Sequence, residues 1–280
     1  MRPQSDFVPL SLRQGVPMGR HLLTGAVLVW FGLLILFPLF GIARETLNYS
    51  WETIRATLHS PASVHAFWMT LSLTVAAVMI NTVLGTISAL VLSRQRFFGK
   101  MLLESSIDLP FAISPVVAGF MLILLFGPNG WLGSILERVH VKIVYAFPGM
   151  LLATLFVTMP FVIKEILPVL REFGAEQEES AAVLGADNWQ TFWRVTLPSI
   201  RWGLGYGVTL TIARSIGEFG AVLVVSGSII QKTQTATLMV HDQFTDLNYA
   251  GAFSAALVLA LVSFVILNLI QYVYRRKGEN

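Results

Sequence analysis

The chain has 280 residues, of which 55% are hydrophobic and only 12% are charged, and its mean hydropathy is +0.69. Soluble domains carry about 25% charged residues, so most of this chain is expected to face lipid or other apolar helices. The net charge of +3 gives no reason to expect a nucleic-acid partner, and the absence of cysteine excludes disulfides, thiol catalysis and metal sites with Cys ligands.

Six apolar runs are long enough to cross a bilayer, whose hydrocarbon core of ~30 Å requires about 20 helical residues. We predict membrane spans over residues 22–43, 66–92, 107–126, 143–163, 202–226 and 250–274. The first run is too long for a cleavable signal peptide and lacks a small-residue cleavage site, so it is expected to stay as an anchor. The expected fold is therefore an all-α integral membrane protein with six transmembrane helices.

The third run is interrupted by residues that disfavour a straight helix. Asp108 is most simply the start of a helix, and Pro110 and Pro115 predict that the helix is kinked or broken. Together with Gly119, the prolines would form either a flexible gate or a kink alone, and we favour the kink.

The distribution of Lys and Arg predicts which loops face the cytoplasm, because positively charged loops are retained on that side. Thirteen Lys and Arg residues fall in one set of loops and both chain ends, against five in the opposite set. Both termini and residues 164–201 are therefore predicted to be cytoplasmic, with residues 44–65, 127–142 and 227–249 outside. The predicted division is a cytoplasmic tail over residues 1–20, a transmembrane domain over residues 21–275 and a second cytoplasmic tail over residues 276–280.

Between the fourth and fifth runs lies a polar segment, EQEESAAVLGADNWQTFWRVTLPSIR, over residues 176–201. Residues 175–184 favour a helix, and three glutamates stand near its start, where the helix dipole stabilises negative charge. Gly185 fits as the left-handed residue that ends this helix. We therefore expect a first short helix followed by a glycine turn.

A second short helix is predicted directly after this turn. Asp187 is a suitable N-cap, and Gln190 three residues later completes a capping-box pair. Pro198 is expected to end the helix, because the residue before a proline avoids the α region. Three aromatic side chains would form a docking surface, pack on the protein's own helix ends or lie at the membrane interface, namely Trp189, Phe192 and Trp193.

The spacing within this segment resembles the EAA loop of ABC importer permeases, which reads E-A-A-x3-G-x9-I-x-L-P. The matching residues are Glu179, Ser180, Ala181, Gly185, Val195, Leu197 and Pro198, with Ser180 in place of the first alanine and Val195 in place of isoleucine. The resemblance covers residues 60–275. It implies a type I (MetI-like) importer fold, in which the EAA coupling loop, here residues 171–201, places a coupling helix in a cleft of a cytoplasmic ATPase.

Three stretches narrow the resemblance to the sulfate/thiosulfate permeases, and within them to the CysW-type subunit. They are LPFAISPVVAG (109–119), NWQTFWRVTLPSIRW (188–202) and ARSIGEFGAVLVVSGSI (213–229). Molybdate permeases share a similar GEFGA stretch, so molybdate, tungstate or another oxyanion is the alternative substrate.

The same resemblance implies a location and a set of partners. The location is the bacterial cytoplasmic (inner) membrane. The partners are membrane lipid, a second homologous permease subunit, two cytoplasmic ATPase subunits and a periplasmic or extracellular sulfate-binding protein. ATP and Mg²⁺ would be bound by the ATPase subunits, with no cofactor on this chain, which has no G-x-x-x-x-G-K-[ST] phosphate loop.

Two charged residues lie near the middle of the fifth span. A charge at the centre of a membrane helix costs about 2.5–3.5 kcal/mol, and Arg214 and Glu218 are spaced to pair on one helix face. The pair would either lock the helix into the bundle or place Arg214 on the path of an anion. Just beyond, Ser226 and Ser228 would either donate to an oxyanion or belong to a turn at the membrane exit.

Other classes of function fit the sequence less well. A secondary transporter or channel that used Arg214 and Glu218 as a relay would not need the EAA pattern, and no inverted repeat is visible. An intramembrane enzyme would need a nucleophile–base pair or paired acids on a span, and we find neither, so a non-catalytic subunit is predicted. The five histidines show no ligand spacing, and no metal site is predicted.

Overall fold

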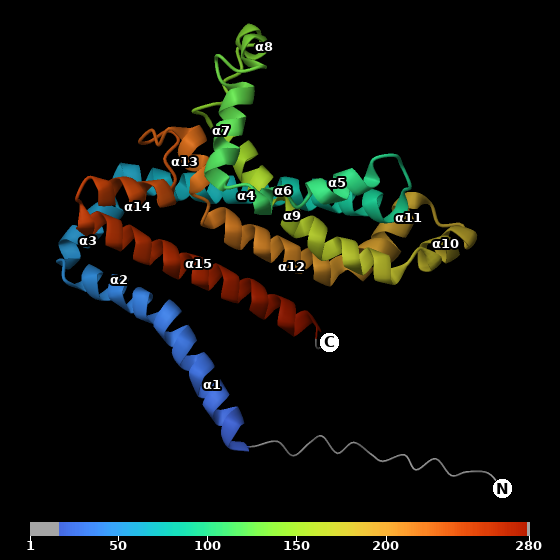
Figure 1. The fold of residues 1–280 in the computed structure, drawn as a ribbon, viewed down its shortest axis with the longest axis horizontal. Helices are drawn as coiled ribbons and strands as arrows, with labels where there is room; N and C mark the ends of the chain where they lie inside the picture. Colours follow the sequence, from blue (N-terminus) through green and yellow to red (C-terminus); the bar gives the residue numbers. More distant parts are fainter. Residues whose placement is uncertain (1–16, 279–280) are drawn as a thin grey trace.

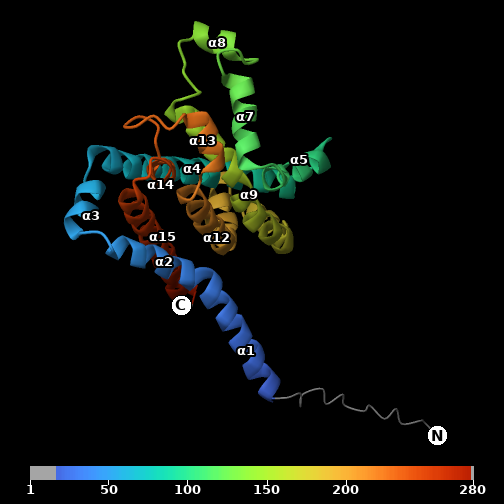
Figure 2. The same cartoon turned by 60° about the vertical axis from the view of Figure 1, so that its left-hand side comes forward.

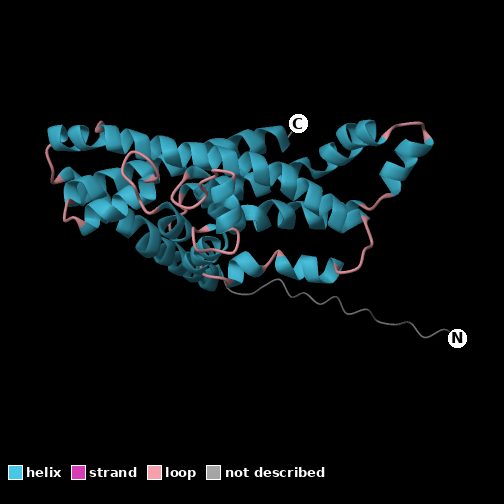
Figure 3. Cartoon of the chain, turned by 90° about the horizontal axis from the view of Figure 1, so that it is seen from above, coloured by secondary structure: helices cyan, strands magenta, loops and turns pink. Residues whose placement is uncertain are grey.

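The computed structural model describes residues 17–278, and the regular structure over this range is entirely helical (Figure 3). The predicted tails lie outside the described residues over 1–16 and 279–280. The helices are α1 (Pro17–Phe31), the π-helix η1 (Gly32–Leu36), α2 (Phe37–Leu47), α3 (Trp51–Leu58), α4 (Pro61–Arg94), α5 (Lys100–Ser106), α6 (Leu109–Ala112), α7 (Pro115–Phe126), α8 (Gly133–Arg138), α9 (Phe147–Phe173), α10 (Glu176–Val183), α11 (Asn188–Thr191), the π-helix η2 (Phe192–Thr196), α12 (Leu197–Ile216), α13 (Gly220–Ser226), α14 (Ala236–Thr245) and α15 (Tyr249–Gly278).

Three long helices, α4, α9 and α12, pack along one another and form the centre of the molecule (Figure 1). One buried cluster joins α4, α9 and α13 and contains Leu73, Met150 and Val222. A second cluster joins α4, α9 and α12 and contains Ile163 and Ile200. Because α4 and α9 both contribute to both clusters, these two helices lie at the centre of the bundle.

Two parts of the chain extend away from this bundle (Figure 2). α1 diverges from it at one end of α2, and none of the most apolar window within Leu22–Leu47 is buried. α7 and α8 rise from the bundle in another direction (Figures 1 and 2). Apolar side chains that are exposed in this way are expected where a helix faces lipid or another chain.

Close packing of the central helices depends on glycines that face Val162 of α9. A Cβ atom at Gly207 of α12 would lie 2.9 Å from the Cα atom of Val162, and one at Gly85 of α4 would lie 2.8 Å from its Cγ1 atom. Val162 itself is fully buried. Small residues allow helix backbones to approach this closely in membrane proteins.

We expect Gly207→Ala to destabilise the protein, by about 1–3 kcal/mol, because the added methyl group overpacks this contact. Alanine is otherwise the better helix former by about 1 kcal/mol. The matched control is Gly41→Ala in α2, where an added Cβ meets no atom within 4 Å. Thermal unfolding in detergent should show a lower Tm for Gly207→Ala only, and equal Tm values for the two variants would contradict the close approach.

The number of membrane spans agrees with the prediction from hydropathy. Among the described residues four helices are long and apolar enough to cross a membrane, and the number is six if each of two bent helix pairs forms one span. The third span is one of these pairs, because Lys100–Ala112 and Pro115–Phe126 meet at 114°. The interruption predicted from Pro110 and Pro115 is confirmed, as a complete break rather than the kink that we favoured.

Two other spans differ from simple straight helices of the predicted length. The fifth span is not one helix, because α12 ends at Ile216 and α13 begins at Gly220 after a bend of 54°. The helix of the fourth span runs beyond the predicted end of the span at residue 163 and continues to Phe173. It continues because Ile166 and Leu170 extend the buried face of α9, so the charged residues of this stretch are carried on its other side.

Pro198 does not end a helix, which corrects a further prediction. The chain stays helical over Asn188–Ile216 through the π-helix η2, where the N–H of Leu197 donates to the carbonyl of Phe192. This wider turn directly before the proline accommodates its ring and its missing N–H group. The π-helix η1 precedes Pro38 in the same way.

Candidate functional site

The EAA segment, residues 176–198, protrudes beyond the end of α9 (Figure 1). It consists of the short helix α10, a turn at Gly185 and the first turns of the continuous helix Asn188–Ile216. α10 ends at Val183, and Gly185, which follows the C-cap residue Leu184, has the left-handed φ of +89°. Asp187 accepts the N–H of Gln190 at 2.7 Å, and the Gln190 side chain accepts the N–H of Asp187 at 3.3 Å. The left-handed glycine and the capping box predicted from the sequence are therefore confirmed.

An apolar surface covers the tip of this segment. Val183 and Leu184 are each 88% exposed, Trp189 is 69% exposed and Trp193 is 50% exposed. The two indole rings meet edge to face with their centroids 5.6 Å apart. We call these four residues the tip surface. Because its side chains are exposed rather than packed on the helix ends of this chain, the tip surface is suited to contact another protein.

The residues that match the EAA pattern differ in exposure. The exposed ones are Glu179, Ser180, Gly185 and Pro198, whereas Ala181 and Leu197 are half-buried. Leu197 packs against the second buried cluster of the bundle. The polar residues of the pattern, Glu179 and Ser180, are therefore exposed, whereas Leu197 near its other end packs against residues of α12 and α9.

Glu178 connects the EAA segment to the rest of the bundle. Its Oε2 atom accepts the Nε–H of Arg94 at 2.9 Å, and its Oε1 atom accepts from Arg94 Nη2 at 3.1 Å and from the Thr196 hydroxyl at 2.8 Å. Nη1 of Arg94 also donates to the carbonyl of Leu170 at 3.0 Å. We call these four residues the Glu178 clamp. It joins α4, α9, α10 and η2, and no local sequence pattern predicts it.

Arg214 and Glu218 form the predicted ion pair, with Nη1 and Oε2 2.8 Å apart. They do not share one helix face, because Glu218 lies in the break between α12 and α13. The Glu218 side chain is fully buried, and its Oε1 atom accepts the N–H of Ala221 at 3.0 Å. Its backbone carbonyl accepts the hydroxyl of Thr237 at 2.8 Å. Glu218 thus holds α12, α13 and α14 together at the break.

The two serines of the candidate site are engaged elsewhere. Ser226 is buried at the end of α13, and its hydroxyl oxygen accepts the N–H of Ser228 at 3.1 Å. The Ser228 hydroxyl donates to Asp242, whose carboxylate also accepts from Gln234 at 2.7 Å. These contacts hold the turn between α13 and α14, so an oxyanion would have to displace them to bind there.

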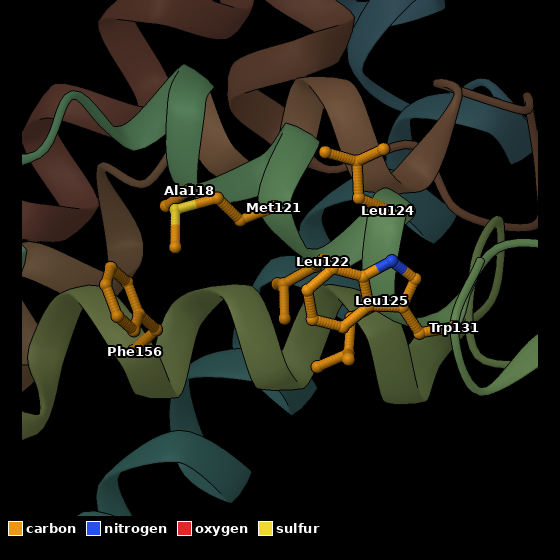
Figure 4. A pocket seen from close by; sticks show the side chains of 7 residues that line it. All are labelled: Ala118, Met121, Leu122, Leu124, Leu125, Trp131 and Phe156. Carbon is orange, nitrogen blue, oxygen red and sulfur yellow. The ribbon is translucent and has the colours of Figure 1, made fainter.

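Two other kinds of site find little support among the described residues. No group of three or more His, Asp or Glu side chains there is arranged to hold a metal ion. A cavity of about 320 Å³ beside α7 and α9 has only the indole nitrogen of Trp131 as a polar side-chain group (Figure 4), and is lined by Ala118, Met121, Leu122, Leu124, Leu125, Trp131 and Phe156. It suits an apolar chain and offers no charge to balance an oxyanion.

Comparison with known sequences gives a family and close relatives. The family of inner membrane components of binding-protein-dependent transport systems matches residues 81–279. The chain is 48% identical over 257 residues to the sulfate transport system permease protein CysW of Synechococcus elongatus, covering 92% of this chain and 90% of that protein. It is 36% identical over 270 residues to the sulfate transport system permease protein CysT of Escherichia coli K12, covering 96% and 97%.

Comparison with solved structures supports the same fold. A bacterial alginate ABC transporter, crystallised in complex with a periplasmic protein bound to an alginate pentasaccharide, matches with a TM-score of 0.78. The sequence identity is 17%, and the match covers 92% of this chain and 94% of that one. The likeness therefore concerns the fold, and it confirms the importer-permease fold predicted from the sequence.

Proposed function

Because this chain belongs to the family of inner membrane components of binding-protein-dependent transport systems, we propose that it is a permease subunit of an ATP-driven importer for sulfate or thiosulfate. The substrate is assigned from the similarity, along nearly the whole chain, to two permeases of sulfate transport systems. Molybdate, tungstate or another tetrahedral oxyanion is the alternative substrate, because molybdate permeases share a similar GEFGA stretch.

The EAA segment is the part of the chain that receives the driving force. The excess of Lys and Arg supports a cytoplasmic position for both termini and for this segment. There the exposed tip surface docks on an ATPase subunit, which binds ATP and Mg²⁺ and carries out the hydrolysis that this chain does not. ATP binding brings two ATPase subunits together, the two docked segments follow, and the permeases switch between inward-facing and outward-facing states.

The complete importer contains further chains. A second permease, related to this one as CysT-type chains are, completes the pore, and two ATPase subunits dock on the two EAA segments. A sulfate-binding protein on the outer side delivers the anion. A structural relative that was solved with its periplasmic protein supports this last partner.

We expect a strain that lacks this chain to lose uptake of radiolabelled sulfate and to recover it when the chain is supplied again. Excess unlabelled thiosulfate should compete strongly with sulfate, and excess molybdate only weakly. The control is uptake of an unrelated solute, which should not change. Unchanged sulfate uptake in the deletion strain would contradict the assignment of sulfate as the substrate. If unlabelled molybdate competed with labelled sulfate as strongly as unlabelled sulfate does, the alternative oxyanions would be favoured.

A further inference from the structure

A second cavity, of about 400 Å³, lies where the third span is broken between α6 and α7. Residues 110–115 form one wall, Val157 and Phe161 of α9 form another, and Arg214 of α12 completes the lining. Arg214 is the only charged side chain among the residues that line it. The cavity therefore differs from the apolar one beside α7, because it exposes a cation with no carboxylate in its lining.

The ion pair at this cavity is asymmetric. The side chain of Arg214 is 33% exposed, whereas that of Glu218 is fully buried and lies outside the lining. A guanidinium carries five N–H donors, and a single carboxylate cannot use all of them. The buried carboxylate reduces the net positive charge, so an anion at Arg214 is attracted without being held as tightly as by an unpaired cation.

The break in the third span adds a neutral donor to the same cavity. Ser114 lies in its lining and makes no side-chain capping bond to α7. α7 begins at Pro115, also in the lining, which has no N–H group to donate, but the helix dipole favours negative charge at that end. A cation, a hydroxyl group and the positive end of a helix therefore meet at one cavity.

We propose that this cavity is an oxyanion subsite on the translocation path, with Arg214 as its cation, Ser114 as its neutral donor and the positive end of the α7 dipole beside them. The ligand class is a tetrahedral dianion such as sulfate or thiosulfate. The inference rests on the proposed function and deepens it by giving the anion a place inside the membrane, where it is bound weakly enough to move on.

The test is a double variant, Arg214→Gln with Glu218→Gln, in proteoliposomes that hold the complete importer. Removing both charges leaves no unpaired carboxylate buried. We expect uptake of radiolabelled sulfate to fall by about tenfold or more, as for the loss of one charge-assisted hydrogen bond, while the partner permease and the ATPase still co-purify. The matched control, Asp108→Asn with Lys164→Gln, neutralises a neighbouring ion pair outside this cavity and should import normally.

Uptake at the wild-type level by the Arg214→Gln/Glu218→Gln variant would contradict the proposed subsite. The ion pair between Arg214 and Glu218 would then have a structural role alone. If that variant does not assemble, the single variants Arg214→Lys and Ser114→Ala test the subsite instead. Each alters the donors of the cavity and keeps a cation beside Glu218. Both should lower the maximal uptake rate severalfold, and unchanged rates in both would overturn the proposal. Failure of the wild-type importer to take up sulfate would overturn the proposed function instead, and the same variants would then be compared with labelled molybdate.

Discussion

Replacing Arg94 with Gln is expected to lower the amount of sulfate imported per ATP hydrolysed by about tenfold or more, because the Glu178 clamp would be lost. Arg94 holds both carboxylate oxygens of Glu178 and the carbonyl of Leu170. A hydrogen bond to a charged group contributes about 1.5–3 kcal/mol, and about 1.4 kcal/mol is a factor of ten in an equilibrium. Movement of the tip surface would then reach α12 through the continuous helix, but the direct side-chain link from Glu178 to α4 would be lost.

Glu178→Gln tests the Glu178 clamp by changing the acceptor instead of the donor. Glutamine keeps an acceptor for Thr196 but loses the charge that pairs with Arg94. Residues in one network do not contribute additively, so Arg94→Gln combined with Glu178→Gln should be no more impaired than the worse single variant. The measurement is labelled sulfate uptake and ATP hydrolysis in the same proteoliposomes, with the binding protein present.

The matched control for the clamp is the ion pair between Arg171 and Glu104, which joins α9 to α5 with Nη2 and Oε1 2.7 Å apart. Its side chains are 50% and 31% exposed, against 21% and 20% for Arg94 and Glu178. Exposed pairs contribute about 0–1 kcal/mol, so Arg171→Gln with Glu104→Gln should import like the wild type. Equal import ratios in the clamp and control variants would contradict the clamp, and co-purification of the ATPase shows whether docking was lost instead.

The spans could be predicted because a membrane crossing requires a minimum length of apolar helix. Hydropathy does not show where such a run bends. Pro110 and Pro115 indicate the first break through their missing N–H groups, but the second break, at Glu218, contains no proline. It is held partly by Thr237, which comes 19 residues later in the chain. The helix continues through Pro198 because a π turn precedes it. The rule that the residue before a proline avoids the α region does not take such a turn into account.

The local geometry of the EAA segment could be predicted because its signals act over a few residues, as Gly185 and Asp187 do. The Glu178 clamp could not be predicted in the same way. Arg94 is 84 residues from Glu178 in the chain, and the EAA spacing singles out Glu179 rather than Glu178. The proposed oxyanion cavity is likewise formed by four separate helices, so it becomes visible only once their packing is known.

Gly185→Val is expected to reduce the amount of ATPase that co-purifies with the permease by about five- to thirtyfold. The φ of +89° at this position costs a residue with a Cβ atom about 1–2 kcal/mol, which is a factor of about 5–30. The N–H of Ala186 closes the turn by donating to the carbonyl of Ala181 at 3.0 Å, as in a Schellman motif. With valine the turn would open, and the part of the tip surface on α10 would move away from the part on the second helix.

Gly99 provides the matched control, because its φ of +86° is nearly the same and an added Cβ again meets no atom within 4 Å. Gly99→Val has the same backbone cost but lies before α5, outside the EAA segment, so co-purification should be retained. An equal loss in both variants would indicate general destabilisation, and full co-purification with Gly185→Val would contradict a role of the turn in docking. Gly185→Asn should also retain the ATPase, since asparagine tolerates the left-handed conformation. Loss with valine and retention with asparagine would assign the effect to backbone geometry, because neither residue's Cβ atom meets another atom at this turn.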